Sequence, residues 1–278
     1  MRMKTRTYYA IITLIIGFLF FVVYTMPFIR SIVVSFMTWE QASRIPPEWI
    51  PKPFIPDNYM KLFRVAMFPR WVANTLIYGV AISITNIFLG LMAGYSFAIL
   101  RYPGRDTVFS MLLALMMLPM FVTMVPMYVI LRQLNLLDNI AALVILGMVS
   151  VSTVFMARQY YLSLPRDYFE AARLDGASYI RIFFEIALPM AKPLIIAITV
   201  YQFLGAWNAF FLPVIVLKSP ENFVYAQGLN YAFSRGWYTE YTPIIAGTII
   251  GSIPTLLFFL LFRKYLIGGI VIRTYRGR

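Results

Sequence analysis

Residues 71–100 read WVANTLIYGVAISITNIFLGLMAGYSFAIL and contain no charged side chain, although arginines stand immediately before and after them. An α-helix rises 1.5 Å per residue, so about 20 apolar residues cross the hydrocarbon core of a bilayer. Only helices and closed barrels satisfy the backbone in lipid, and this stretch lacks the alternation of a barrel strand. It therefore predicts a membrane-spanning helix.

Five other segments are also free of charge and long enough to span a membrane. They are residues 7–29, 107–131, 139–157, 193–217 and 241–262. The sequence therefore predicts an all-α polytopic membrane protein with six transmembrane helices in a single domain, residues 1–278. We interpret residues 7–29 as a retained helix, because the segment is too long for a signal peptide and no small-residue cleavage site follows it.

The composition agrees with a membrane protein, since 61% of the residues are hydrophobic and 13% are charged. The chain has no cysteine and no histidine, which excludes disulfides, thiolate chemistry and the commonest general base. The net charge of +13 comes without a basic run in a soluble motif, so we expect no nucleic-acid partner. We also expect no catalytic residue and no metal site.

The distribution of lysine and arginine predicts the orientation. If the N-terminus is cytoplasmic, 15 of these residues lie in inner segments and 9 in outer ones, so the positive-inside rule places both termini in the cytoplasm. Residues 31–70 then form an external loop, expected to be irregular because five prolines lie within residues 46–56. Residues 158–192 form a helical cytoplasmic loop, and residues 263–278 form a cytoplasmic tail.

The spans contain no ionisable group of the kind that proton- or sodium-coupled transport uses. The chain also lacks the glycine-rich phosphate loop with its lysine, so we expect it not to bind ATP in that way. Any energy for transport must then come from another subunit. The loop 158–192 is the only inner segment large enough to receive it.

Within this loop, residues 164–189 read LPRDYFEAARLDGASYIRIFFEIALP. The triplet Glu170-Ala171-Ala172, followed by Gly176, Ile186 and Leu188-Pro189 at fixed spacings, resembles the EAA loop of ABC importer permeases. Pro165 suits the first turn of a helix, and Gly176 suits its end. The two alanines leave a narrow surface that another protein can approach closely.

Other segments narrow the resemblance to maltose-type (MalG-like) sugar permeases. These segments are residues 57–59, 101–105, 133–138, 206–213 and 263–265, with Gly268-Gly269. The similarity covers most of residues 57–278. The last seven residues depart from it because they lack the small-residue run common in that group, so the contacts of the tail stay open.

The resemblance implies the transmembrane domain of a type I ABC importer in a prokaryotic cytoplasmic (inner) membrane. The implied partners are a second homologous permease subunit, a dimer of ABC ATPases, an extracytoplasmic solute-binding protein and a carbohydrate substrate. ATP and magnesium would be bound by the ATPase, and no cofactor by this chain. The residues implied to couple to the ATPase are Glu170, Ala171, Ala172, Asp175, Gly176, Leu188 and Pro189.

Helix 193–217 is the candidate for the solute pathway. Tyr201, Gly205 and Asn208 recur at i, i+4 and i+7 and so share one face, where an aromatic ring and an amide suit a sugar. Hydrogen bonding between helices explains Tyr201 and Asn208 equally well. Gly90 and Gly94 are expected to pack closely against another helix, and Pro119 and Pro126 to kink the span 107–131.

Several alternatives remain. The loop 158–192 could be an amphipathic helix on the lipid surface, and Asp175-Gly176 resembles the start of a magnesium-binding motif of membrane transferases, whose later aspartates are missing here. The importer could carry a non-sugar solute such as a polyol or glycerol-phosphate. An ion-coupled secondary transporter is a further alternative. The sequence does not identify the sugar, its chain length or how two permease subunits share its contacts.

Overall fold

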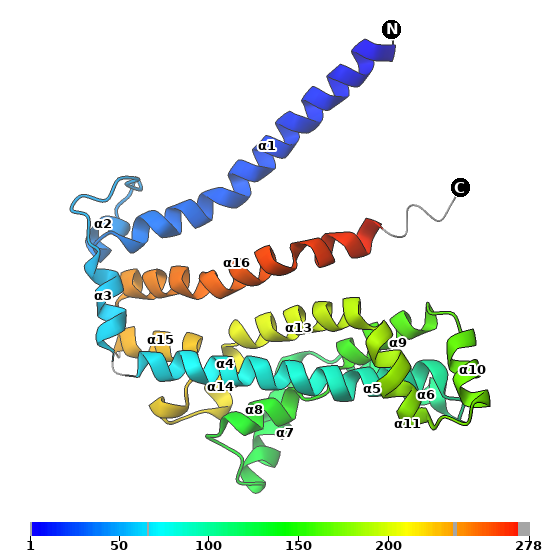
Figure 1. The fold of residues 1–278 in the computed structure, drawn as a ribbon. Coiled ribbons are helices and arrows are strands. Elements are labelled where there is room, and N and C mark those ends of the chain that lie inside the picture. Colours follow the sequence, from blue (N-terminus) through cyan, green and yellow to red (C-terminus); the bar gives the residue numbers. More distant parts are fainter. Residues whose placement is uncertain (1, 66, 236–237, 272–278) are drawn as a thin grey trace. The chain divides into compact units, whose positions relative to one another are not determined.

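The computed structural model describes residues 2–65, 67–235 and 238–271, and helices dominate these residues (Figure 1). The helices are α1 (Arg2–Ser35), α2 (Trp39–Ala42), α3 (Asp57–Arg64), α4 (Phe68–Thr85), η1 (Asn86–Gly90), α5 (Leu91–Ile99), α6 (Arg105–Leu115), α7 (Met120–Gln133), α8 (Ile140–Gly147), α9 (Val151–Leu162), α10 (Asp167–Leu174), α11 (Tyr179–Ile182), η2 (Phe183–Ala187), α12 (Leu188–Met190), α13 (Lys192–Trp207), α14 (Phe211–Val216), η3 (Pro220–Asn222), α15 (Tyr225–Phe233) and α16 (Tyr241–Val271). Two-residue strands β1 (Ser234–Arg235) and β2 (Tyr238–Thr239) form a small antiparallel hairpin. The predicted all-α class is confirmed.

Backbone contacts divide the chain into two compact units. The first contains the chain up to Phe68 together with Leu229–Pro254, and the second contains Pro69–Gly228 together with the chain from Thr255 onward. All the residues of the predicted coupling loop and of the predicted solute pathway belong to the second unit.

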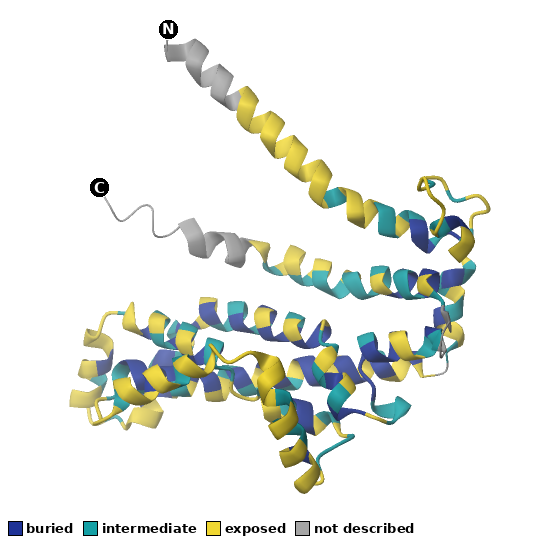
Figure 2. Ribbon diagram, turned by 180° about the vertical axis from the view of Figure 1, so that it is seen from behind, coloured by how far each residue is buried: buried dark blue, intermediate teal, exposed yellow. Residues whose placement is uncertain are grey.

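Four stretches of helix in the described part of the chain are long and apolar enough to cross a membrane, and two bent helix pairs bring the number to six if each pair is one span. The four are Ile11–Ser35, Phe68–Ile99, Ile140–Leu162 and Tyr241–Arg263. Most apolar residues described in α1 are exposed, and Figure 2 colours most of this helix as exposed. This is the pattern of a helix in contact with lipid or another subunit.

The expected continuous helix over residues 107–131 is instead broken. Helix α6 ends at Leu115, α7 begins at Met120, and the two are bent by 100°. Pro119 stands at the N-cap of α7 with extended backbone angles, and a proline cannot donate the hydrogen bond that would continue the helix. The predicted kink is therefore present at Pro119, whereas Pro126 lies inside α7.

The expected helix over residues 193–217 is also interrupted. Helix α13 ends at Trp207, and α14 starts at Phe211. A continuous helix would place Pro213 against the carbonyl of Ala209, where its ring clashes and its hydrogen bond is missing. The segment that precedes α13, Tyr179–Met190, is bent from it by 80°.

The segment 31–70 is less irregular than expected. Helix α1 continues to Ser35, and α2 and α3 both lie in the segment. The amide of the buried Asn58 donates to the carbonyls of Ser35 and Met37, 2.9 Å from each, and so joins α3 to the end of α1. The proline-rich residues 43–56 form no helix. Of the expected tail, residues up to 271 continue α16, and residues 272–278 lie outside the described part.

Small residues bring η1 and α5 into close contact with α9 in the second unit, as predicted for Gly90 and Gly94. A Cβ atom at Gly90 would lie 2.6 Å from Cγ2 of Thr153, and one at Gly94 would lie 2.3 Å from Cβ of Ala157. Without a hydrophobic driving force between helices in lipid, such close packing is a main source of their association.

A buried polar cluster joins the helices beside this contact. The amide of Asn86, in the π-helical turn η1, accepts hydrogen bonds from the Ser150 N–H at 2.8 Å and from the Gln202 amide at 3.1 Å, and donates to the Gly147 carbonyl at 2.7 Å. Gln202 also donates to Thr153 at 2.8 Å. These bonds connect η1, α9 and α13. They also provide hydrogen-bond partners for polar groups that are buried away from water, where an unpaired group would be costly.

Candidate functional site

Helix α10 carries the Glu170-Ala171-Ala172 triplet and is anchored through one aromatic side chain. Phe169 is buried in a hydrophobic cluster and lies against Tyr95 of α5, with ring centroids 6.2 Å apart. Glu170 and Ala171 are exposed, and Ala172 packs in part against the cluster. The helix therefore has one face fixed to α5 and another open to a partner.

The end of α10 is a Schellman turn centred on Gly176. Gly176 has φ +83°, its N–H donates to the Arg173 carbonyl at 3.1 Å, and the Ala177 N–H donates to the Ala172 carbonyl at 3.0 Å. Both bonds satisfy carbonyls that the helix end would leave unpaired, and the left-handed conformation strongly favours glycine. The glycine predicted from the motif thus has a defined backbone role.

The charged side chains in α10 and at its C-terminal end differ in whether they have a partner within the chain. Arg173 donates to the Ala177 carbonyl at 2.7 Å and lies 4.1 Å from the centroid of the Tyr179 ring, so it braces the turn. The carboxylates of Glu170 and Asp175 are exposed, and within the described residues neither makes an ion pair or a side-chain hydrogen bond. They are available to a cationic partner.

Leu188 and Pro189 lie apart from the Glu170 face, at the junction with α13. Leu188 packs against the same hydrophobic cluster as Phe169, while Pro189 is exposed in α12. The Tyr160 hydroxyl donates to the Met190 carbonyl at 2.9 Å and holds the junction against α9. The structure therefore places these two predicted residues where the loop is joined to the membrane helix.

The face of α13 that carries Tyr201, Gly205 and Asn208 is exposed, and the opposite face is buried. A Cβ atom added at Gly205 would meet no atom within 4 Å. Trp207 lies on the buried face, between Phe203 and Tyr225, with ring centroids 6.0 and 5.8 Å away.

Hydrogen bonding between helices was the alternative explanation for the polar residues of α13, and the structure shows such bonds at a different residue. The Asn208 amide donates to the Leu204 carbonyl at 2.8 Å, within its own helix, so it caps α13. The polar link between helices is made by the buried Gln202 instead. A glutamine among apolar residues is a sequence signal, but only its partners identify it as a structural group. Among the described residues, no three side chains of the kinds that bind metal come together.

Sequence reasoning also missed the role of Asp138, the last residue of the 133–138 motif. Its carboxylate accepts hydrogen bonds from the N–H groups of Lys218 and Ser219, both at 2.9 Å, and from the Ser219 hydroxyl. The Asp138 N–H donates to the Val216 carbonyl at 2.8 Å. Asp138 therefore fastens the loop before α8 to the loop after α14.

The same bonds set the acidity of Asp138. Partial burial alone raises its pKa, but the hydrogen bonds from Ser219 and Lys218 outweigh this and bring the pKa down to about 2. A carboxylate with a lowered folded-state pKa stabilises the fold above its ordinary pKa and loses that effect as the pH falls through the folded value. The contribution of Asp138 is thus complete at neutral pH and disappears between about pH 4 and pH 2.

We expect Asp138→Asn to lower the free energy of unfolding by about 2 kcal/mol at pH 7, because it removes a charge-assisted set of hydrogen bonds. Thermal unfolding of the full chain in detergent measures this, and the gap from wild type should narrow at pH 3. Asp57→Asn is the matched control, since Asp57 and Arg64 form an exposed ion pair of 3.3 Å that contributes little. A gap that stays constant down to pH 2 would contradict the assignment.

Comparison with known proteins identifies related chains. Residues 86–266 match the family described as binding-protein-dependent transport system inner membrane component. The chain is 35% identical over 228 residues to the arabinooligosaccharides transport system permease protein AraQ of Bacillus subtilis (strain 168), covering 82% of this chain and 81% of that protein. It is 27% identical over 267 residues to the sn-glycerol-3-phosphate transport system permease protein UgpE of Yersinia pestis, covering 94% of each.

A solved structure shows the same fold. It is the crystal structure of a bacterial ABC transporter involved in the import of the acidic polysaccharide alginate, and one of its chains matches with a TM-score of 0.80 and 21% sequence identity. The match covers 94% of this chain and 97% of that one.

Proposed function

The chain belongs to the family of inner membrane components of binding-protein-dependent transport systems, and from this premise we propose that it is a permease subunit of an ATP-driven carbohydrate importer. The similarity to an arabinooligosaccharide permease over four fifths of both chains supports a saccharide as the solute. The subunit spans the inner membrane several times and forms half of the pathway. ATP is hydrolysed by a partner ATPase, and a second permease and an external solute-binding protein complete the importer.

The observation that carries the proposal is the geometry of α10. Phe169 fixes the helix to the membrane-spanning core, the Gly176 turn ends it sharply, and Glu170 and Asp175 face outward with their carboxylates unpaired among the described residues. A short helix held in this way transmits the movement of a docked partner as a rigid body, because a packed core resists gradual deformation. We propose that this helix lies on the cytoplasmic side and docks in a groove of the ATPase.

The exposed face of α13 is proposed to line the solute pathway. It offers the Tyr201 ring for stacking on a sugar, the open space at Gly205 and the carbonyl of the Asn208 amide as an acceptor. This face carries no positive charge between Tyr201 and Asn208, whereas a phosphate-bearing solute calls for arginine or lysine. The second candidate, import of a glycerol-phosphate, is favoured only by the similarity to the Yersinia permease.

Intact-mass measurement of the complex purified in mild detergent from its native membrane tests the proposal. We expect one copy of this chain, one copy of a different permease and two ATPase copies. With the binding protein added, arabino-oligosaccharides should stimulate ATP hydrolysis and sn-glycerol-3-phosphate should not. A chain that purifies alone or only with itself would contradict the importer. Stimulation by glycerol-phosphate alone would overturn the choice of solute.

A further inference from the structure

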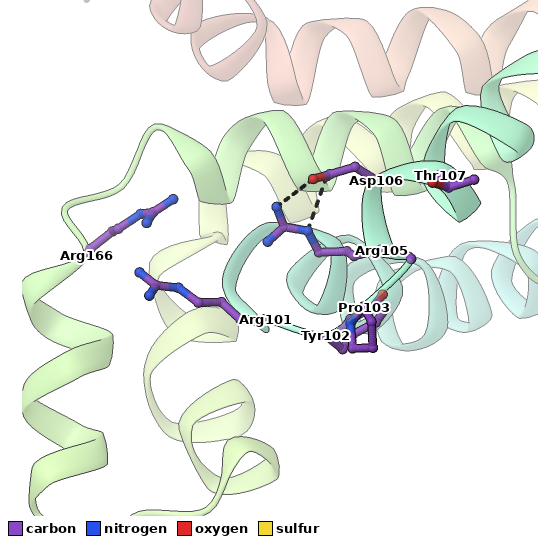
Figure 3. Close-up of a pocket in the computed structure, with 8 residues that line it drawn as sticks. Arg101, Tyr102, Pro103, Arg105, Asp106, Thr107 and Arg166 are labelled. Carbon is purple, nitrogen blue, oxygen red and sulfur yellow. Dashed lines mark hydrogen bonds and ion pairs between the residues drawn. The ribbon is translucent and has the colours of Figure 1, made fainter.

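Two basic cavities lie beside α10, and both open between the loop after α5 and the start of α10. The larger, of about 660 Å³, is lined by the loop residues 101–107 and by Arg166 (Figure 3). The smaller, of about 300 Å³, shares Arg101 and Arg166 and is also lined by Arg173 and Glu170. Together they form what we call the arginine pocket.

The arginines of this region are not equivalent. Arg105 and Arg158 are both paired with Asp106, at 3.1 and 3.0 Å, and these pairs hold the pKa of that carboxyl below its usual range. The side chains of Arg101 and Arg166 make no hydrogen bond or ion pair within the described residues, and Figure 3 shows their guanidinium groups pointing toward each other.

Two like charges that face each other repel, and an anion between them removes the repulsion and gains two charge-assisted hydrogen bonds. The nearby carboxylates do not fill this role. Asp106 is engaged by Arg105 and Arg158, and Glu170, on the rim of the smaller cavity, reaches neither Arg101 nor Arg166. Guanidinium groups suit phosphate especially well because their donors form a planar fork.

An apolar groove adjoins the arginine pocket. A third cavity, of about 270 Å³, shares Tyr179 with it and continues along α5 and α11. Its lining residues are Met92, Tyr95, Ser96, Leu100, Tyr179, Ile180 and Phe183. Ile180 is 69% exposed, although it is a large apolar side chain. The groove thus has little polar lining and remains uncovered within the chain.

The groove and the pocket meet where a membrane span ends. Helix α5 closes the uncharged stretch 71–100, and Arg101 is the first charge after it. The groove therefore lies beside the last turns of the span, at the depth of the acyl chains, and the arginines lie at the depth of the lipid headgroups. An acidic segment of a soluble partner could pair with the arginines. It would not fill the apolar groove, which faces the hydrocarbon of the membrane.

We propose that this site binds an anionic phospholipid, with its phosphate between Arg101 and Arg166 and one acyl chain in the groove formed by α5 and α11. The inference rests on the membrane placement of α5 and does not depend on the solute or on the ATPase. A lipid bound there joins the end of a span to the start of α10 and so steadies the helix that carries Glu170.

Native mass spectrometry of the full chain in neutral detergent, titrated with phosphatidylglycerol or phosphatidylcholine, tests the site. We expect at least tenfold tighter retention of phosphatidylglycerol. The double variant Arg101→Gln/Arg166→Gln should weaken it about 25-fold, roughly fivefold for each arginine. Ile180→Ser, in the groove, should weaken it about fivefold. Arg181→Gln is the matched control, because Arg181 is exposed on α11 and paired with Glu185 at 2.9 Å.

Circular dichroism is the folding control: variants that keep the wild-type helix content show that a changed retention reports the site. Equal retention of the two lipids, or unchanged retention by the double variant, would overturn the proposal. Displacement of the lipid by millimolar inorganic phosphate, with Ile180→Ser behaving as wild type, would instead indicate a pocket for free anions. Displacement by the ATPase dimer would assign the arginines to a protein interface, whereas retention in its presence supports the lipid.

Discussion

Replacing Gly176 by proline is expected to reduce uptake about 100-fold while the membrane helices stay folded. Proline holds φ near −65°, whereas Gly176 has φ +83°, and proline lacks the N–H that donates to the Arg173 carbonyl. A cost of about 3 kcal/mol leaves the native turn populated at roughly 1%, and the affinity of a partner for the native turn falls by the same factor. The ATPase should then be lost on purification.

The matched variant is Gly176→Asn, because asparagine adopts the left-handed conformation more readily than other residues and also ends helices. We expect it to keep uptake within a few-fold of wild type. Circular dichroism and the yield in the membrane fraction report whether the spans are intact. If proline and asparagine reduced uptake equally, the glycine would matter for a reason other than its backbone conformation. Full uptake by the proline variant would remove α10 from the coupling pathway.

The second large effect is expected on stability, from Gly94→Ala. The added Cβ would lie 2.3 Å from Cβ of Ala157, 2.9 Å from the backbone nitrogen of Arg158 and 3.0 Å from the carbonyl oxygen of Val154. Two of these three neighbours are backbone atoms, which cannot rotate away, so α5 and α9 must separate. Overpacking of this kind costs about 1–3 kcal/mol, and we expect a value near the top of that range.

Thermal unfolding of the full chain in detergent measures the change. Gly17→Ala is the control, because a Cβ at Gly17 meets nothing within 4 Å and alanine favours a helix by up to about 1 kcal/mol over glycine. Adding Ala157→Gly to Gly94→Ala removes the 2.3 Å contact but not the two backbone contacts, so stability should return only in part. Wild-type melting of Gly94→Ala would show that the two helices do not pack as described.

The local pattern predicted several features that the structure shows. Gly90 and Gly94, four residues apart, indicated a close-packing face, and Thr153 and Ala157 occupy it. Gly176 was expected to end a helix and does so in a left-handed turn. Each of these depends on backbone geometry within a few residues, and for that reason the sequence contains enough information to predict it.

The interruptions were harder to predict. Both broken spans are as apolar as the continuous ones, so hydropathy does not distinguish them. Pro119 was recognised as a kink, but a bend of 100° depends on how α6 and α7 pack after the break. Pro213 gave a similar signal in the other broken span and was interpreted only as part of a motif.

Charge and hydropathy alone determined the membrane class, because a bilayer restricts the possible folds to very few. The motif that resembles the EAA loop predicted a helix that ends at Gly176, and this turn is local. Only the tertiary structure showed that Asp138 fastens two loops, that Gln202 rather than Asn208 links the helices, and that Arg101 faces Arg166. The hydrogen-bonded partners lie between 49 and 116 residues apart, and Arg101 and Arg166 lie on separate loops. A local sequence pattern does not indicate which distant residues the packing will bring together.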